Sequence, residues 1–252
     1  MTVAPFQPAD DSIVENALLG GRVRLRQPAR GYRAGMDAAL LAAAVAAEPG
    51  ERVIEAGCGA GAVLMQIAAR CPGVALTGLE RDPAMAALAR ENAALNGADA
   101  QIVEGDVAAG FRALDLPLFD RAVSNPPFFD DPGALRAPAE GKRGAWMADD
   151  GLKAWTTFLL KSVREGGRIV VIHRADRLAD LLALLGETAG SFAVRGIHPH
   201  ADEPAKRVLV QAIKTGKAPL RLLPPLVLHD RSGAKHTAEA EAVLRGEAGL
   251  GW

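Results

Sequence analysis

The chain has 252 residues, of which 49% are hydrophobic and 23% are charged, and its formal net charge is −1. This length suits one α/β domain, and this hydrophobic content is enough to form a full core. A nearly neutral chain has no global basic field, so binding of a nucleic acid would need a local basic patch. The two cysteines, Cys58 and Cys71, fit neither a disulfide framework nor a zinc site. We therefore expect a cytoplasmic protein with no metal centre and no membrane partner.

The first predicted elements precede residue 51. Val23 and Leu25 alternate with arginines, which predicts an edge strand. Asp37 is positioned to cap a helix that runs to about Ala47.

Strands and helices then alternate along the chain. The sequence predicts strands at 52–57, 74–80, 100–106, 119–125 and 166–174, and helices at 62–70, 82–97 and 150–164. Asp176 is a candidate cap for a further helix that ends at Leu185. Segments 191–200 and 206–214 favour an antiparallel pair at the sheet edge, and 225–247 favours a strand, a turn and a short helix.

This alternation predicts an α/β fold with a mostly parallel sheet covered by helices on both faces. We find no repeat and no low-complexity linker, so the sequence predicts one domain. Within it we distinguish an N-terminal extension, a catalytic core and a C-terminal tail of strand, turn and helix, at 1–36, 37–214 and 215–252.

A glycine-rich loop, "EAGCGAG", leaves the strand at 52–57 and enters the next helix. Gly57, Gly59 and Gly61 allow tight turns and a close approach of the backbone to a ligand. The same letters also fit the dinucleotide pattern of nicotinamide enzymes, and a glycine loop without a ligand is a further interpretation. Glu55 precedes the loop and would place a carboxylate beside a cationic ligand. Cys58, inside the loop, is expected to pack rather than to act as a nucleophile.

Acidic residues also follow the next two strands. Glu80 is placed to hold ribose hydroxyls, and Asp106 to meet an adenine amino group. Their neighbours Arg81 and Val107 complete this expected nucleoside site. Each carboxylate alone could be a solvated turn residue, but Glu55, Glu80 and Asp106 occupy corresponding positions at three strand ends.

The fourth strand of this series ends in "NPPF", which is Asn125, Pro126, Pro127 and Phe128. Prolines and phenylalanines could simply stop a strand and join the core, but this does not explain the asparagine. Together with the glycine loop and the acidic strand ends, the motif resembles that of class I S-adenosylmethionine-dependent methyltransferases. These enzymes methylate conjugated nitrogens in adenine, guanine or glutamine. The resemblance implies S-adenosylmethionine as the cofactor.

The chemistry explains these residue types. The nitrogen of a purine amine or a side-chain amide is a poor nucleophile because its lone pair is delocalised. The Asn125 oxygen and the Pro126 carbonyl can accept hydrogen bonds from its N–H groups, which orients the lone pair and stabilises the growing positive charge. Phe128 can stack on the flipped-out base or planar amide. The proton leaves later to solvent, so no strong general base is needed.

Residues 18–45 resemble the N-terminal signature of the bacterial methyltransferases that form N6-methyladenine beside the anticodon of valine tRNA. This resemblance rests on the segment "GYRAGMDAALL" and on two segments near the end of the sequence, "KRVLVQAIKTG" and "HTAEAEAVL". It implies a seven-stranded Rossmann-like sheet with an antiparallel edge strand, and places Gly35 and Asp37 near the methionine end of the cofactor. At Phe128 many tRNA-acting members have tyrosine; stacking survives this change.

Two basic segments are candidates for contact with RNA. Arginines are densest near the N-terminus, at positions 22, 24, 26, 30 and 33. The segment after "NPPF" adds further candidates, Arg136, Lys142, Arg143 and Trp146. Arg33, Lys142 and Arg143 could contact phosphates and Trp146 a base, or these segments could be a solvated edge and a loop.

The leading hypothesis is N6-methylation of an adenine in tRNA. Alternatives are N-methylation of ribosomal RNA guanine, of a release-factor glutamine or of a small molecule. A cofactor-binding module without catalysis, associated with RNA or ribosomes, and a nicotinamide dehydrogenase are further alternatives.

Overall fold

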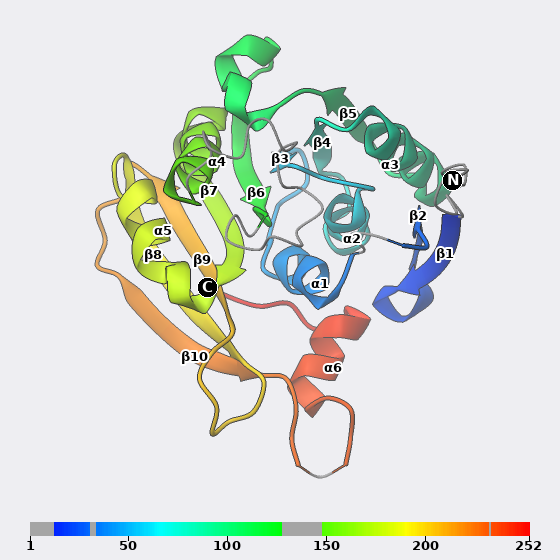
Figure 1. Ribbon diagram of the computed structural model, residues 1–252, viewed down its shortest axis with the longest axis vertical. Helices are drawn as coiled ribbons and strands as arrows, with labels where there is room; N and C mark the ends of the chain where they lie inside the picture. Colours follow the sequence, from blue (N-terminus) through cyan, green and yellow to red (C-terminus); the bar gives the residue numbers. More distant parts are fainter. Residues whose placement is uncertain (1–12, 31–33, 128–147, 232) are drawn as a thin grey trace, which may run out of the picture.

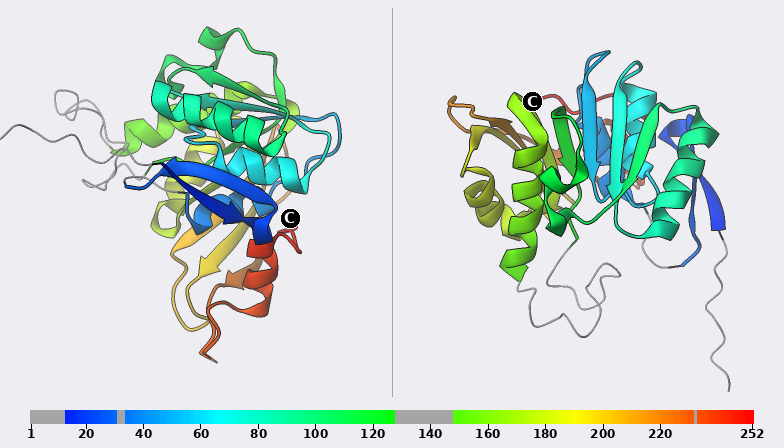
Figure 2. Two further views of the ribbon diagram at one scale, coloured as in Figure 1. Left: turned by 90° about the vertical axis from the view of Figure 1, so that its right-hand side faces the viewer. Right: turned by 90° about the horizontal axis from the view of Figure 1, so that it is seen from above.

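The computed structural model describes residues 13–30, 34–127, 148–231 and 233–252, with the side chains of 148–150 excepted. Its largest element is an eight-stranded sheet with the strand order β10-β8-β9-β7-β6-β3-β4-β5. Figures 1 and 2 show this sheet with helices on both faces. The strands are β3 (Arg52–Ala56), β4 (Ala75–Glu80), β5 (Ala100–Glu104), β6 (Phe119–Ser124), β7 (Val163–Arg174), β8 (Ala189–His198), β9 (Arg207–Lys214) and β10 (Arg221–Val227).

The sheet is mostly parallel, as the alternation of strands and helices predicts. Strand β9 is antiparallel to both of its neighbours, β7 and β8, whereas β10 lies parallel to β8 at the edge. The expectation of an antiparallel edge strand is therefore wrong, because β9 inserts between β7 and β8. The expected count of seven strands is one too low, since β10 extends the sheet.

Two hydrophobic layers flank the sheet. One contains α1 (Met36–Ala43), α2 (Ala62–Arg70), α3 (Pro83–Asn96) and α6 (Ala238–Arg245). The other contains α4 (Ala148–Ser162), α5 (Leu178–Leu185) and the short 3-10 helices η2 (Val107–Ala109) and η3 (Phe111–Leu114). Alternate residues of the central strands point to opposite layers: Val123 belongs to the first layer and Ala122 to the second. No helix among the described residues is long and apolar enough to cross a bilayer.

Helix α3 illustrates how local signals set an element. The Asp82 carboxylate caps it by accepting the N–H groups of Ala84 and Met85, Pro83 opens its first turn, and Gly97 ends it in the left-handed conformation. The predicted bounds of this helix are confirmed.

Two predicted caps are wrong. Helix α1 begins at Met36 after Gly35 and ends at Ala43, with Asp37 inside its first turn. Helix α5 follows the 3-10 helix η5 (Ala175–Arg177) and has no side-chain cap. Asp37 instead accepts a hydrogen bond from Arg207 at 3.0 Å, and Asp176 pairs with Arg174. In both cases the carboxylate forms an ion pair with an arginine, and neither helix has a side-chain cap.

The predicted strand near Val23 is β2 (Val23–Pro28), but it does not belong to the large sheet. It pairs antiparallel with β1 (Ile13–Leu18), and the turn between them contains the 3-10 helix η1 (Leu19–Gly21). This hairpin lies beside α3 at the end of the sheet that carries β5 (Figure 1).

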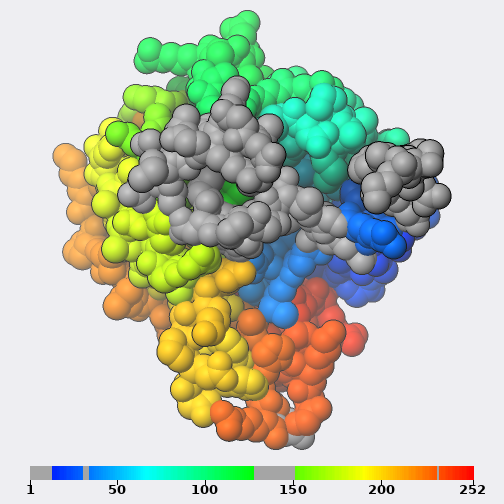
Figure 3. Space-filling view, viewed as in Figure 1, coloured from blue at the N-terminus to red at the C-terminus, as the bar shows by residue number. Residues whose placement is uncertain are grey.

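The C-terminal segment returns to the first layer. After β10, α6 packs near α1 and η1, and Figure 3 shows the orange and red segment at the lower end of the molecule. The Arg22 guanidinium donates to the carbonyls of Arg245 and Gly246 at the end of α6, and the Trp252 indole donates to the Ala44 carbonyl at 2.7 Å. The tail is thus hydrogen-bonded to both the hairpin and α1.

Candidate active site at the carboxyl edge of the sheet

Four parallel strands end side by side at one edge, in the spatial order β6, β3, β4, β5. The residues predicted from their strand ends therefore follow the same order along this edge: Asn125, Glu55, Glu80 and Asp106. Between β6 and β3, the Ser124 hydroxyl donates to the Ala56 carbonyl at 2.9 Å. This bond ties the start of the "NPPF" motif to the strand that leads into the glycine loop.

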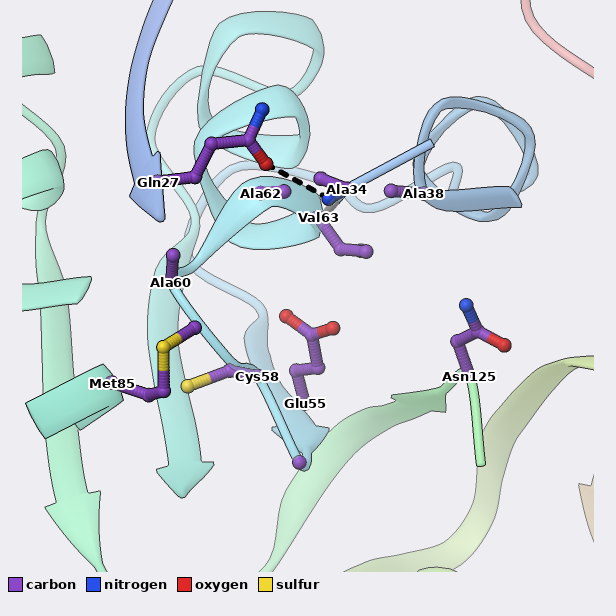
Figure 4. Close-up of a pocket in the computed structure, with 11 residues that line it drawn as sticks. Gln27, Ala34, Ala38, Glu55, Cys58, Ala60, Ala62, Val63, Met85 and Asn125 are labelled. Atoms are coloured by element: carbon purple, nitrogen blue, oxygen red, sulfur yellow. Dashed lines mark hydrogen bonds between the residues drawn. The ribbon is translucent and has the colours of Figure 1, made fainter. Parts of the chain in front are cut away.

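A pocket lies at this edge between the sheet, α1 and α2. Figure 4 shows the Glu55 carboxylate and the Asn125 amide directed to the same side, toward Val63 and Ala38. Glu55 is 2% exposed. The residues lining the pocket are Gln27, Ala34, Ala38, Glu55, Gly57, Cys58, Ala60, Ala62, Val63, Met85 and Asn125.

The glycine loop turns through left-handed backbone conformations. Gly57, Gly59 and Gly61 have φ angles of 69°, 55° and 83°. This region is unfavourable for residues with a Cβ, so the sequence uses glycine at all three positions. Cys58 is buried, and its Sγ would lie 2.7 Å from a Cβ built on Gly78, so the side chain packs on β4 as expected.

Glu80 organises the loop through backbone hydrogen bonds. Its Oε2 accepts the N–H of Gly59 at 2.8 Å, and its Oε1 accepts the N–H groups of Arg81 and Asp82, each at 3.0 Å. The side chain thus holds the glycine loop and the turn after β4 together. Binding of ribose hydroxyls remains a prediction for this residue, and it would use the remaining acceptor capacity of the carboxylate.

Asp106 caps η2 by accepting the Ala108 N–H at 2.9 Å, and its other oxygen lies 4.0 Å from the Arg81 guanidinium. The two predicted residues Arg81 and Asp106 are therefore close to each other. Asp106, Val107, Glu80 and Arg81 do not line the pocket that contains Glu55. Their expected role in binding a nucleoside remains a prediction.

Gly35 and Asp37 flank the pocket, which Ala34 and Ala38 line. The Asp37 carboxylate is paired with Arg207 of β9, so its oxygens are partly occupied. The positions of Gly35 and Asp37 near the methionine end of the cofactor remain predictions.

Sequence reasoning missed Gln27. It is 4% exposed, its Oε1 accepts the Ala34 N–H at 2.9 Å, and its Nε2 donates to Asn16 at 2.8 Å. Figure 4 shows the first of these bonds above the pocket. Val23 and Leu25 alternate inward on β2, and Gln27 is the next inward position. A polar residue in that register is the signal that could have identified it.

The arginines at positions 22, 24 and 26, on β2 and directly before it, are engaged within the protein. Arg24 and Arg26 both bond to Glu15, at 2.7 and 3.3 Å, and Arg22 holds the end of α6. These three side chains are therefore not a free basic patch. Arg33, Phe128, Arg136, Lys142, Arg143 and Trp146 lie outside the described residues, so their predicted roles remain predictions.

Comparisons with known proteins agree with this fold. Residues 33–137 match the model of the methyltransferase small domain. The chain is 28% identical over 195 residues to a tRNA1(Val) (adenine(37)-N6)-methyltransferase of Dickeya chrysanthemi, covering 76% of each chain. It is 43% identical over 147 residues to a release factor glutamine methyltransferase of Deinococcus radiodurans, covering 55% of this chain. It spans about half the length of that relative, 51%.

Among solved structures, a predicted O-methyltransferase from Agrobacterium tumefaciens superposes with a TM-score of 0.70 at 28% identity. The match covers 86% of this chain and 99% of that one. The fold and the sequence matches together define a class I S-adenosylmethionine-dependent methyltransferase. Its segment 33–137 carries the methyltransferase small domain.

The residues of the pocket fit the methyl donor of this class. S-adenosylmethionine is a cation that carries a carboxylate, and a buried carboxylate such as Glu55 is stable beside a positive charge or hydrogen-bond donors. Small side chains such as Ala34, Ala38, Ala60 and Ala62 leave room near the backbone.

Proposed function

We propose that this chain transfers a methyl group from S-adenosylmethionine to the exocyclic N6 amine of an adenine in tRNA. The observation that carries the proposal is that Asn125 and Glu55 line the same pocket, at the edge where β6 and β3 end. An acceptor for the amine N–H groups then stands beside the residues assigned to the donor. Bond formation from nitrogen to the methyl carbon accompanies cleavage of the sulfur–methyl bond.

In this proposal the protein orients the amine and stabilises the positive charge that grows on its nitrogen. The Asn125 Oδ1 and the Pro126 carbonyl accept the two N–H groups of the amine and orient its lone pair toward the methyl group. Pro127 holds that carbonyl rigid by fixing the backbone. The nitrogen carries a positive charge after transfer and releases its proton to solvent.

The choice of tRNA rests on the two ends of the chain. The N-terminal "GYRAGMDAALL" and the C-terminal close resemble tRNA-acting enzymes, and the Dickeya relative aligns over three quarters of both chains. The Deinococcus relative is more identical but aligns over a shorter span, which makes methylation of a release-factor glutamine the second candidate. Both reactions use an Asn-Pro-Pro motif on a planar nitrogen, so Asn125 alone does not separate them.

A basic surface for RNA is proposed on α4, in place of the paired arginines of β2. Lys153 and Lys161 are exposed on one face of this helix, and within the described ranges neither forms an ion pair. They flank a groove of about 300 Å³ whose apolar floor includes Phe111 and Phe158, next to η2. Ammonium groups beside an apolar floor suit phosphates and an unstacked base.

The test is methyl transfer from labelled S-adenosylmethionine to three separate pools: unmodified tRNA, ribosomal RNA and release factor. Products are digested and identified by mass spectrometry. We expect N6-methyladenine from tRNA only, reduced about 100-fold or more by Asn125→Ala, as for loss of a transition-state hydrogen bond. Binding of S-adenosylhomocysteine to that variant shows that it is folded. Methylglutamine from release factor, or transfer to neither RNA, would overturn the tRNA assignment.

A further inference from the structure

The feature behind this inference is a pair of asparagines one turn apart on α3. The Asn92 Oδ1 accepts the Arg26 N–H and its Nδ2 donates to the Arg26 carbonyl, both at 2.8 Å. In the same way, the Asn96 Oδ1 accepts the Arg24 N–H at 2.9 Å and its Nδ2 donates to the Arg24 carbonyl at 2.7 Å. Each carboxamide thus forms the two hydrogen bonds to β2 that the backbone of a neighbouring strand would otherwise form.

The spacing of the two elements makes this possible. Arg24 and Arg26 are two residues apart on a strand, which separates them by about 6.6 Å. Asn92 and Asn96 are four residues apart on a helix, which rises about 6.0 Å over that distance. Strand β2 pairs with β1 along one edge. The two asparagines of α3 form hydrogen bonds with backbone groups on the other edge, which would otherwise stay unpaired.

The two asparagines differ in one contact. The Nδ2 of Asn92 also donates to the Ala60 carbonyl at 2.9 Å, and Asn92 is 0% exposed. The Nδ2 of Asn96 instead donates to the Asn92 carbonyl, within its own helix. Only Asn92 therefore joins the hairpin to the glycine loop.

Both segments that Asn92 joins contribute to the pocket. Ala60 lines it from the glycine loop, and Gln27, which follows Arg26 on β2, lines it from the hairpin. Gln27 in turn holds the backbone of Ala34, the residue before Gly35. The hydrogen bonds of Asn92 and Gln27, linked by the peptide bond between Arg26 and Gln27, therefore connect the glycine loop through β2 to the segment that precedes α1.

We propose that Asn92 is a positioning residue for the methyl donor, acting by setting the glycine loop and the β1–β2 hairpin at a fixed separation. This inference rests on the proposed assignment of the pocket as the donor site. The donor has to bridge two walls that belong to different parts of the fold. One carboxamide bound to both backbones keeps them in register before the donor arrives, which lowers the entropic cost of ordering them on binding.

The test compares Asn92→Ala with Asn96→Ala. Both variants remove two hydrogen bonds to the backbone of β2, but only Asn92→Ala frees the Ala60 carbonyl. We expect the Kd for S-adenosylmethionine to rise about 10-fold or more in Asn92→Ala and to stay within about twofold in Asn96→Ala, because pre-ordering is lost only in the first. Isothermal titration measures both, and kcat at saturating donor should remain within about threefold in both.

Hydrogen exchange supplies a readout that general destabilisation does not reproduce. Asn96→Ala should accelerate exchange in 23–28 only, whereas Asn92→Ala should accelerate it in both 23–28 and 57–61. If Asn92→Ala does not fold, Asn92→Asp replaces it, since this variant keeps the bond from the Arg26 N–H and loses both donated bonds.

Two results would overturn the inference and can be told apart. Equal donor affinities in the two asparagine variants would overturn the role of Asn92 alone, provided that Glu55→Gln weakens donor binding. If Glu55→Gln leaves donor binding unchanged, the pocket is not the donor site, and the inference falls together with that assignment.

Discussion

The indole ring of Trp155, on α4, lies directly against the backbone of Gly57 in the glycine loop. A Cβ built on Gly57 would stand 2.3 Å from the indole Cη2, and Trp155 is 8% exposed. The helix that follows the "NPPF" segment in sequence therefore supports the loop that follows β3. Gly57 is required for two reasons, its left-handed backbone and this close approach.

This relationship predicts different costs for two glycine substitutions. Gly57→Ala should lower the free energy of unfolding by about 2–4 kcal/mol, from backbone strain plus overpacking against Trp155. Gly97 has a similar φ angle of 59° but nothing within 4 Å of its added Cβ, so Gly97→Ala should cost only about 1 kcal/mol. Urea unfolding measures both. Similar costs for the two variants would contradict the packing argument.

A second prediction concerns Glu80 and its register partner on β5, Glu104. In Glu80→Gln an amide NH₂ replaces an oxygen that now accepts backbone N–H groups, so two donors face each other. The free energy of unfolding should fall by about 2–4 kcal/mol and donor affinity should fall with it.

Glu104→Gln is the matched control. Glu104 forms an exposed pair with Arg90 at 2.9 Å, and such pairs contribute at most about 1 kcal/mol. Thermal unfolding and titration with S-adenosylhomocysteine should separate the two variants. An unperturbed Glu80→Gln protein would show that the carboxylate does not hold the loop.

The third prediction is a pH dependence set by His173 on β7. The pKa of His173 is lowered from its ordinary 6.5 to about 4, mainly by burial; the charges of Arg177, Arg174 and Arg207 contribute to this lowering and Asp176 opposes it. Between these two pKa values the unfolded chain binds more protons than the folded one. The contribution of His173 is therefore fully present above pH 6.5 and is lost as the pH falls toward 4.

From this linkage we expect the wild-type chain to lose about 1 kcal/mol of unfolding free energy between pH 7.0 and pH 5.5 through this residue alone. His173→Gln should show a correspondingly smaller loss over the same interval. Urea unfolding at the two pH values is the measurement. An identical pH slope in the two proteins would mean that this imidazole does not stay neutral in the fold.

The fourth prediction tests the basic groove on α4. Replacing Lys153 and Lys161 together with Ala should raise the KM for tRNA about 5–10-fold and reduce the slope of log affinity against log salt by about 1–2. Binding of S-adenosylhomocysteine should not change. The control replaces Lys217 and Lys235, which are exposed in the turn after β9 and in the turn before α6. An equal effect in the control would mean that the loss reflects net charge and not this groove.

Several local elements could be predicted because their determinants are contiguous. Asp82, Pro83 and Gly97 mark the ends of α3 within the chain segment that they bound, and the predicted helix is confirmed. The same holds for α2, whose bounds at 62 and 70 follow from the glycine loop and the apolar periodicity. The positions of Glu55, Glu80 and Asn125 at one sheet edge also follow, because parallel strands present their carboxyl ends together.

Other expectations failed where a distant partner competes with a local one. Asp37 resembles a helix cap in sequence, but Arg207 binds it from 170 residues away. The arginines at positions 22, 24 and 26 resemble a basic patch, but Glu15 binds Arg24 and Arg26, and the end of α6 binds Arg22. Charge is visible in a sequence, whereas its neutralisation depends on which chain segments the fold brings together.

By itself, the sequence determined the α/β class, the glycine loop, the acidic strand ends and the motif at Asn125, since each depends on residues that are neighbours along the chain. Only the tertiary structure decided that β9 inserts between β7 and β8, that Trp155 supports Gly57, and that Asn92 joins the hairpin to the loop. The physical reason is that a buried polar or aromatic side chain takes its role from whatever surrounds it, and those surroundings are assembled from segments 30 to 100 residues apart.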